Sequence, residues 1–374
     1  MKNILTAILM FSLSTAYAGN YTYQQNGTVS FGWQTSDVFT VFSVANTVMR
    51  ITTTAVSSSD AHYSTTVRSG WAFPPNTTFY SLYPYSSTYK TSGTSYTAVP
   101  VAYNSQTQKT NASTEHLAAV DYMTAQTAST TDALSFNYKH IGAILRIAAY
   151  VPETKIFSSL KLTTKDNTAW FAEEATVNAT DNTMSVTTAA ATATLTLSNI
   201  TVEGGDSLIA YIMTAPTDLT GKSMQLSINA TDGSMLQTYI AGNDIQAGKV
   251  YPVSVGRENY FRIQNDNSGA GEDTPEVLSL PIEIENNVTS DDQILTATAY
   301  APDFTIDTEN EMTPFLLGDV NLDGTVDVTD VVIVVNHFQN DTTDELDMNV
   351  ADIDGDGVID VTDVVGIVNI YQRK

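Results

Sequence analysis

Aspartates near the C-terminal end form the pattern in this sequence with the clearest potential for chemistry. A twelve-residue segment, DVNLDGTVDVTD, begins at Asp319, and a second copy, DIDGDGVIDVTD, begins at Asp352. In each copy, oxygen-bearing side chains occupy positions 1, 3, 5, 9 and 12, and glycine occupies position 6. This spacing lets a flexible backbone wrap around a hard cation that takes about six to eight oxygen ligands. The segments therefore predict two Ca²⁺ sites.

Each predicted site draws its ligands from one copy of the segment. Position 7 contributes its backbone carbonyl oxygen, and position 9 binds directly or through a water molecule. Gly324 and Gly357 stand at position 6, where the chain must turn sharply. Mg²⁺ fits less well, because its smaller octahedral shell dehydrates reluctantly. The predicted ligands are Asp319, Asn321, Asp323, Thr325, Asp327 and Asp330 in the first loop, and Asp352, Asp354, Asp356, Val358, Asp360 and Asp363 in the second.

A helix is expected directly after each loop, because apolar residues continue there at helical spacing. They are Val328, Val331 or Val332, Val335 and Phe338 after the first loop, and Val361, Val364 or Val365, Val368 and Tyr371 after the second. The aspartate at position 9 can cap each helix. A solvated, disordered acidic tail is the alternative, but it would not need this periodicity. No helix pattern precedes either loop.

The duplicated loop and helix, residues 316–374, closely resembles a type I dockerin. The resemblance depends on aspartate at position 12, on the missing preceding helix and on Asn336 and Asn369 at matching places. It implies that calcium folds the module and that the module binds a cohesin domain of a partner protein, in either of two orientations. The many valines leave the cohesin type open. The implied partner-binding residues are Val328, Thr329, Val335 and Asn336, with Val361, Thr362, Val368 and Asn369 in the second copy.

Composition excludes several other classes of function. The chain has 374 residues, with 41 Asp and Glu against 16 Lys and Arg, for a net charge of -25. Such a charge repels nucleic acid and anionic lipid. The lack of cysteine excludes disulfides, cysteine-ligated metals, thiol catalysis and a lipid-anchoring cysteine. The four histidines are far apart in the sequence, so no spacing of histidines indicates a transition-metal site.

The first residues predict export. Met1–Ala18 runs from Lys2 through an apolar stretch to Ala16-Tyr17-Ala18, which is typical of a cleaved secretory signal peptide. The apolar stretch is too short to span a bilayer, and no later segment is long enough. We therefore expect an extracellular protein associated with the cell surface, and not a lipoprotein.

From Asn20 to about Gly256 the sequence predicts a mainly β fold. Short segments of β-forming residues recur between Ser, Thr, Asn, Asp and Gly, as is typical of antiparallel sandwiches. Clear examples are Val38 to Val44, Leu134 to Tyr138, Ala143 to Val151 and Ala193 to Leu197. The length favours two small sandwiches, with a division near Pro152. Residues 257–315 have the composition of a linker, although Val277 to Ile284 and Ile294 to Ala301 could form a strand pair.

Several fragments in this region resemble the fimbrillin-like proteins of Bacteroidetes. They are Phe31-Gly32-Trp33, Phe79 to Tyr85, Asp121 to Ala125, Leu134 to His140 leading into Ile144 to Ile147, and Ile245 to Tyr251. The resemblance implies two tandem transthyretin-like β-sandwich domains, at 19–152 and 153–256, in a noncatalytic adhesin or structural subunit. Fimbrillins are exported as lipoproteins and polymerise by strand exchange, but this chain has no cysteine for lipid attachment. We expect docking onto a cohesin to replace the fimbrillin route of assembly.

Two other classes of function stay open. The aromatic cluster Trp71, Phe73, Phe79, Tyr80, Tyr83, Tyr85 and Tyr89 could stack on sugars, which would make the protein a glycan-binding component of a polysaccharide-degrading complex. An aromatic β-sandwich core is the plainer interpretation of that cluster. A hydrolase has little support, because the sequence shows no nucleophile elbow, no paired acid and base carboxylates and no triad spacing.

Overall fold

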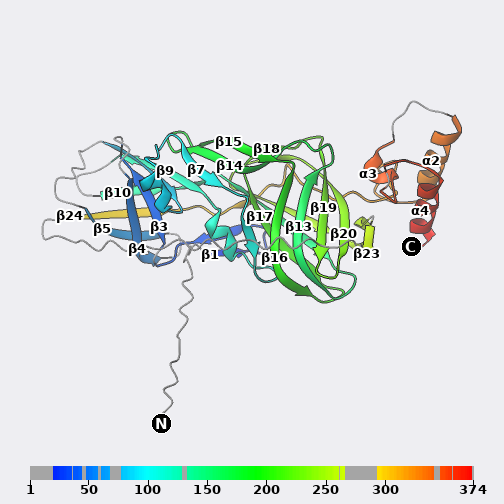
Figure 1. Ribbon diagram of the computed structural model, residues 1–374, viewed down its shortest axis with the longest axis horizontal. Helices are drawn as coiled ribbons and strands as arrows, with labels where there is room; N and C mark the ends of the chain where they lie inside the picture. The colour runs from blue at the N-terminus through cyan, green and yellow to red at the C-terminus, as the bar shows by residue number, and fades with distance from the viewer. Residues whose placement is uncertain are drawn as a thin grey trace, which may run out of the picture.

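A computed structural model describes residues 20–35, 37–43, 48–57, 60–67, 77–128, 133–260, 262–265, 293–340, 346–355 and 357–372. The described residues form an elongated β-rich body with a small helical module at one end (Figure 1). We call residues 20–315 the body and residues 316–372 the C-terminal module. The predicted mainly β fold with a helical C-terminal module is confirmed. The expected signal peptide lies outside the described residues.

An eight-stranded sheet makes up the end of the body far from the helical module. Its order is β10-β24-β5-β4-β3-β6-β9-β11. Phe39 and Val41 of β3 and Leu82 of β6 are fully buried, as expected for residues that pack well on a pleated surface. The elements of this half are β1 (Asn20–Tyr23), β2 (Val29–Gly32), β3 (Val38–Phe42), β4 (Val48–Ser57), β5 (Asp60–Val67), β6 (Thr78–Tyr83), α1 (Ser87–Thr91), β9 (Met123–Ala128), β10 (Ala133–Asn137), β11 (Lys139–His140) and β24 (Gln293–Tyr300).

The half of the body next to the module contains three further sheets, with orders β17-β12-β22-β25, β23-β20-β19-β13-β16-β8 and β15-β14-β7, and the short pair β18-β21. Buried and more exposed residues alternate along β19, so one face of its sheet packs on the core. The elements are β7 (Val99–Ala102), β8 (Gln106–Gln108), η1 (Glu115–Ala119), β12 (Ala143–Tyr150), β13 (Lys155–Thr164), β14 (Phe171–Asn178), β15 (Thr183–Ala190), β16 (Thr192–Val202), β17 (Ser207–Thr214), β18 (Thr217–Asp218), β19 (Ser223–Ala230), β20 (Ser234–Ala241), β21 (Asp244–Ile245), β22 (Lys249–Val255), η2 (Arg257–Asn259), β23 (Arg262–Asn265) and β25 (Thr305–Ile306).

The chain does not pass from one half to the other at a single point, because β7 and β8 already pair with β14 and β16 of the half next to the module. β11 still pairs with β9 of the eight-stranded sheet, but β12 pairs with β17 and β22 of the other half. One change of half therefore falls around Ile141 and Gly142, whereas the sequence suggested a division near Pro152. The proline marks only the turn between β12 and β13, and a turn residue does not reveal which sheet its flanking strands join.

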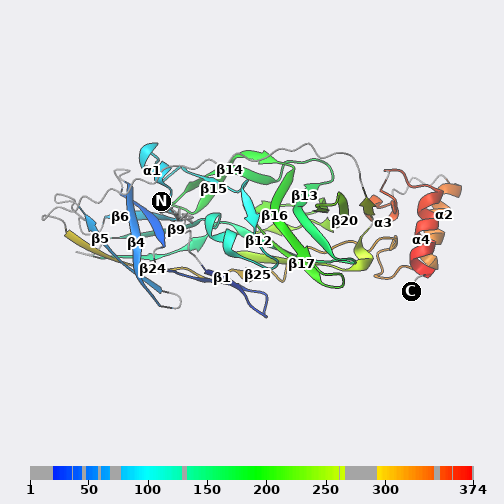
Figure 2. The same ribbon diagram turned by 60° about the horizontal axis from the view of Figure 1, so that its bottom comes forward.

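The described residues of the expected linker 257–315 include three strands that pair with the body. β23 pairs with β20, β24 lies between β10 and β5, and β25 pairs with β22. Figure 2 shows β24 beside β5, at the opposite end of the body from α4. The sequence had allowed a strand at Ile294 to Ala301, but its partner proves to be the distant N-terminal sheet. The other candidate strand, Val277 to Ile284, lies outside the described residues.

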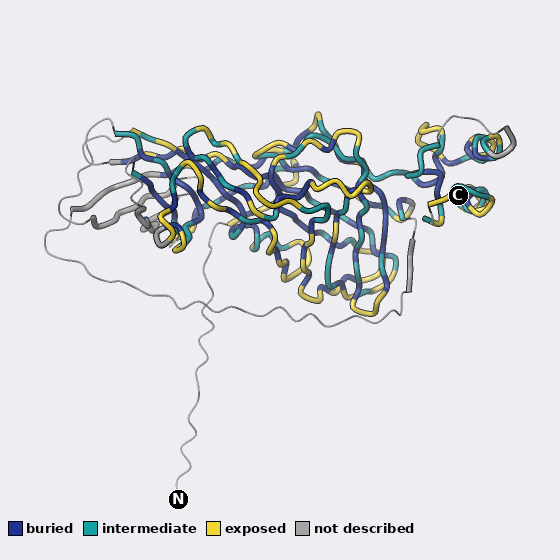
Figure 3. Tube along the Cα trace, turned by 45° about the horizontal axis from the view of Figure 1, so that its top comes forward, coloured by how far each residue is buried: buried dark blue, intermediate teal, exposed yellow. Residues whose placement is uncertain are grey.

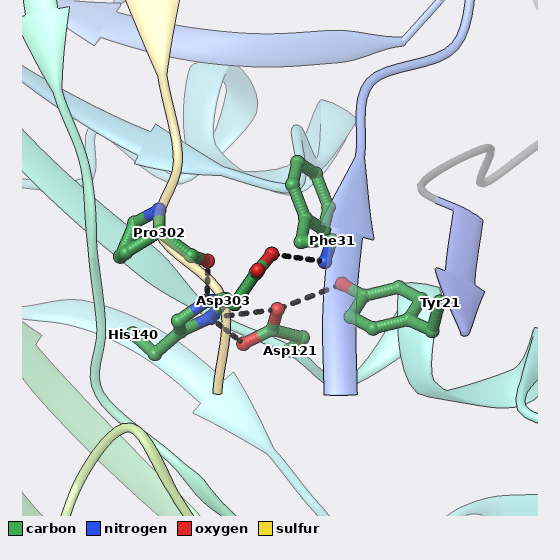
Figure 4. A network of polar contacts seen from close by, with 6 residues as sticks. All are labelled: Tyr21, Phe31, Asp121, His140, Pro302 and Asp303. Carbon is green, nitrogen blue, oxygen red and sulfur yellow. Dashed lines mark hydrogen bonds and ion pairs between the residues drawn. The ribbon is translucent and has the colours of Figure 1, made fainter. Parts of the chain in front are cut away.

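A buried polar network fastens the chain after β24 to the N-terminal strands (Figure 4). His140 Nδ1 is 3.0 Å from Asp121 Oδ1, and His140 Nε2 is 2.6 Å from the carbonyl oxygen of Pro302. Tyr21 donates a 2.7 Å hydrogen bond to the other Asp121 oxygen. Phe31 donates its backbone N–H to Asp303 at 3.0 Å. Residues 302–303 are thus held from two sides, by β11 and by β2.

The C-terminal module contains three helices, α2 (Val328–Asn340), α3 (Met348–Ala351) and α4 (Val361–Gln372), among its described residues. Helices α2 and α4 confirm the helical interpretation of the valine-rich segments. Within the described part of the chain, no helix combines the length and the hydrophobicity needed to cross a bilayer.

Candidate calcium centre

Each loop of the C-terminal module ends in a helix cap built from two aspartates. Asp327 accepts a 2.7 Å hydrogen bond from the backbone N–H of Thr329, and Asp330 accepts one of 2.8 Å from Asp327 N–H. Asp360, Thr362 and Asp363 repeat this arrangement, with both distances at 2.7 Å. The Thr362 backbone and hydroxyl hold the pKa of Asp360 below its usual value. The negative side chains also interact favourably with the positive N-terminal ends of the helix dipoles.

The first loop folds around two buried carboxylates, Asp319 and Asp330. Asp319 accepts hydrogen bonds from Asp323 N–H at 3.0 Å and from Gly324 N–H at 2.8 Å. Asp330 accepts from Val320 N–H at 2.8 Å, and also from Asn321 N–H. Backbone donors of the loop therefore orient positions 1 and 12, so that the loop closes on itself.

The second loop closes in the same way around Asp352 and Asp363, which are also buried. Asp352 accepts from Gly355 N–H at 2.7 Å and from Gly357 N–H at 3.0 Å, and Asp363 accepts from Ile353 N–H at 2.7 Å. One oxygen from each of Asp352, Asp354 and Asp363 lies within 4.8 Å of the others. Three carboxylate oxygens at such separations can share one cation.

The donor set fits Ca²⁺. It consists of carboxylate, amide and carbonyl oxygens, which hard cations prefer, and the described ligand positions offer neither imidazole nor thiolate. Burial of carboxylates this close together is costly unless a positive charge compensates it. Calcium would supply that charge and the coordination bonds that tie positions 1 to 12 together. Asp356, the expected ligand at position 5 of the second loop, lies outside the described residues.

The two loops differ at position 4. Leu322 has φ 58° and is 62% exposed, whereas Gly355 has φ 72° at the matching place. Both position 6 glycines, Gly324 and Gly357, have φ 87°, as expected for sharp turns. A leucine in the left-handed region costs more than a glycine, so the first loop carries strain that the second lacks.

The residues implied to bind a cohesin lie mostly on the surface. Val328 and Val361 are 59% and 70% exposed, which is unusual for valine at the start of a helix. Thr329, Asn336, Thr362 and Asn369 are exposed as well, while Val335 and Val368 are half-buried. The structure thus places six of these eight residues on the exposed surface.

Sequence reasoning missed two members of this surface and one helix. Val332 and Val365 are 48% and 53% exposed, and each lies one turn beyond Val328 or Val361. Their spacing of four residues was the available signal. Helix α3 immediately precedes the second loop, where no helix was expected; Asp347 caps it by accepting a hydrogen bond from Asn349 N–H. Four residues are too few for a periodic pattern to show.

Three of the five described members of the aromatic cluster considered for sugar binding are core residues. Phe79, Tyr83 and Tyr89 are at most 3% exposed, so their faces cannot stack on a ligand. Trp71 and Phe73 lie outside the described residues. Tyr85 is half-buried and lines an open groove of about 380 Å³ together with Pro100, Glu174 and Thr187. The plainer interpretation of the cluster is thus supported for its fully buried members.

Comparison with protein families finds both expected relationships. A family described as fimbrillin-like matches residues 22–269, and the type I dockerin domain matches residues 317–369. No curated protein matches the chain.

Three solved structures from Bacteroides are similar to parts of the chain. A protein of Bacteroides uniformis assigned to cell adhesion is 15% identical, with a TM-score of 0.42; the match covers 61% of this chain and 90% of that one. One from Bacteroides ovatus with the same assignment is 14% identical, with a TM-score of 0.41 and coverage of 64% and 90%. A fimbrial protein of Bacteroides vulgatus is 16% identical, with a TM-score of 0.32 and coverage of 58% and 88%.

Proposed function

The chain belongs to the fimbrillin-like family, and from this premise we propose that it is an exported, noncatalytic adhesin or structural subunit that is displayed through its dockerin. The dockerin binds two calcium ions, one in each loop, and then docks onto a cohesin domain of a partner at the cell surface. The observation that carries the proposal is the pair of closed loops, each with buried aspartates at positions 1 and 12 oriented by backbone N–H groups.

The proposal includes the architecture of the body. Its two halves are transthyretin-like sandwiches that follow one another along the chain, except that β7 and β8 reach into the second half. The position of β24 favours display of a self-contained subunit over polymerisation, because this strand already lies between β10 and β5 of its own sheet. A filled position offers no free strand edges there for another copy to join.

A binding assay of the full chain against a panel of cohesin domains tests the proposal. In calcium we expect saturable binding to at least one cohesin type, lost in chelator and in the double variant Asp319→Ala and Asp352→Ala. Asp181→Ala is the matched control, because Asp181 caps an exposed turn of the body by accepting from Thr183. Undiminished binding of the double variant would contradict the proposal.

Glycan binding is a second candidate, favoured by the groove at Tyr85. A half-buried tyrosine, an exposed carboxylate at Glu174 and the hydroxyl of Thr187 line it, and no Lys, Arg or His is among its lining residues. Such a lining suits a neutral sugar, which offers an apolar face and hydroxyl donors. Retardation in polysaccharide gels should disappear in Tyr85→Ala and persist in Tyr80→Ala, whose ring stacks on Tyr96 outside the groove. Equal mobility with and without polysaccharide would remove this candidate.

A further inference from the structure

The dockerin is attached to the body at two places, only one of which is the covalent connection. Before the first loop, the chain runs along β20: Ala241 N–H donates to Thr313 O at 2.9 Å, and Phe315 N–H donates to Tyr239 O at 3.1 Å. The Asn259 side chain adds a 3.1 Å hydrogen bond to Phe315 O. The covalent connection is therefore itself bound to the sheet.

The second attachment is made by Asn349 of helix α3. Its side-chain amide donates a 2.8 Å hydrogen bond to Ser223 Oγ at the start of β19, and its amide oxygen accepts one of 3.1 Å from Lys165 Nζ. Asp347 orients Asn349 by accepting a 2.8 Å hydrogen bond from the same amide group. Both body partners lie at the sheet end nearest the dockerin, where Lys165 N–H also donates to Ser223 O at 2.9 Å.

Lys165 brings a positive charge to the second calcium loop. Its ammonium lies 4.3 Å from the centre of the Tyr239 ring. Burial lowers the pKa of Lys165, while attraction to Asp352 and Asp347 opposes that change. Asp352 is the first predicted ligand of the second loop and follows helix α3 directly. The body therefore interacts with helix α3, through Asn349, and with the carboxylate of Asp352 at the start of the second loop.

The first loop has no equivalent of this attachment among the described contacts. In the internal repeat, Leu316 stands where the second copy has Asn349. Leu316 packs with the small apolar cluster of the dockerin, and a leucine side chain offers no hydrogen bond. A module whose two halves are nearly identical in sequence is thus held by the connecting chain before its first half and by a side-chain contact of its second half.

We propose that Lys165, Ser223 and Tyr239 form an intramolecular docking surface for helix α3, which fixes the orientation of the dockerin on the body and makes its two halves unequal. Calcium in the second loop orders Asp352 and the end of α3, so it stabilises this contact; calcium in the first loop has no such effect. The dockerin is consequently held in one orientation relative to the body. The inference rests on the proposed function only where it treats the second loop as a calcium site.

Distance measurements between two labels test the inference. Because the chain has no cysteine, Thr231→Cys in the body and Gln372→Cys in α4 give two unique positions for spin labels, and both residues are exposed. In calcium, we expect one narrow distance distribution by pulsed electron paramagnetic resonance. Asn349→Ala and Lys165→Met should each broaden it, while Lys155→Met, which removes a lysine paired with Asp232 at the far end of β13, should leave it narrow.

Helix content and calcium binding of each variant separate this inference from the proposed function. Lys165→Met lies wholly in the body, so it should retain the calcium-dependent helical signal while it loses the narrow distribution. Asp363→Ala should broaden the distance distribution. In Asp330→Ala, a larger fraction of molecules than in Asp363→Ala should keep the narrow distance. A broad distribution in the parental chain, or an unchanged one in both Asn349→Ala and Lys165→Met, would overturn the inference. A missing calcium response with a narrow distribution would instead contradict only the calcium role.

Discussion

The body and the dockerin maintain their structures by different means. The body has one continuous core of buried side chains that extends from Tyr21 to Met312, whereas Val326, Val334 and Ile367 form the buried centre of the dockerin. In Figure 3, dark blue buried stretches recur along the strands of the body, whereas most of the dockerin is teal or yellow. Apolar burial stabilises by about 25 cal/mol per Å², so a core of this size cannot offset the conformational entropy of the dockerin. We therefore expect the folding of the dockerin, and not that of the body, to depend on a bound cation.

The largest expected effect is the response to calcium removal. In chelator, the close carboxylates repel one another, so the dockerin should lose its helical signal completely while the β signal of the body persists. Asp363→Ala should cause much of this loss even in calcium, because it removes a ligand and leaves the N–H groups of Ile353 and Asp360 without their acceptor. Far-ultraviolet circular dichroism of the full chain measures both. A helical signal that persists in chelator would contradict the prediction that the dockerin, unlike the body, needs calcium to fold.

The converse change should affect the body alone. Phe304 is fully buried, with its ring 3.7 Å from that of His140 between centroids. Phe304→Ala should lower the free energy of unfolding of the body by about 3 to 5 kcal/mol, because it leaves a cavity. Denaturant unfolding followed by tryptophan fluorescence measures this loss. Tyr300→Ala, at a residue 44% exposed, should cost much less; equal losses for the two variants would show that Phe304 is not a core residue.

A smaller effect is expected where α4 approaches the second loop. A Cβ atom at Gly366 would lie 2.6 Å from Ile353 Cγ2. Alanine normally stabilises a helix by about 1 kcal/mol relative to glycine, but here overpacking should win and cost about 1 to 3 kcal/mol. Thermal unfolding of the dockerin in calcium measures the change. Adding Ile353→Ala should recover part of the loss, and a gain in stability from Gly366→Ala alone would contradict the close packing.

The smallest effect compares the two loops. Leu322→Gly should relieve the left-handed strain at position 4 and stabilise the calcium-loaded dockerin by less than about 1 kcal/mol, because glycine also gains entropy in the unfolded chain. Gly355→Leu should shift the same thermal transition downward. If both substitutions shift it in the same direction, backbone strain does not distinguish the loops.

The closure of the two loops could be predicted because the information for it is local. Positions 1 to 12 of each loop are contiguous, so residue type and spacing alone suggested that Asp319 and Asp330, or Asp352 and Asp363, would converge. The helices that follow were predicted from the same short segments. The face beyond Val328 was only partly found, because deciding whether Val331 or Val332 is exposed requires the packing of α2 against α4.

Long-range pairing set the limit of prediction in the body. Strand character at Ile294 to Ala301 was recognisable, but its position between β10 and β5 depends on contacts with residues far away in the chain. The same holds for Asn349 and Ser223, which are separated by 126 positions. Tyr83 and Tyr85 illustrate the difficulty at short range: they belong to one aromatic run, yet the first is core and the second lines a groove.

The position of β24 also constrains the order of events during biogenesis. The eight-stranded sheet is built from residues 38–140, but one of its inner strands is made only after residue 292 has been synthesised. While the chain emerges from the ribosome with its N-terminus first, β10 and β5 have unpaired edges until most of the polypeptide has followed. Such unpaired edges are prone to aggregation. A chaperone that covers them until β24 arrives would therefore have a defined place to bind.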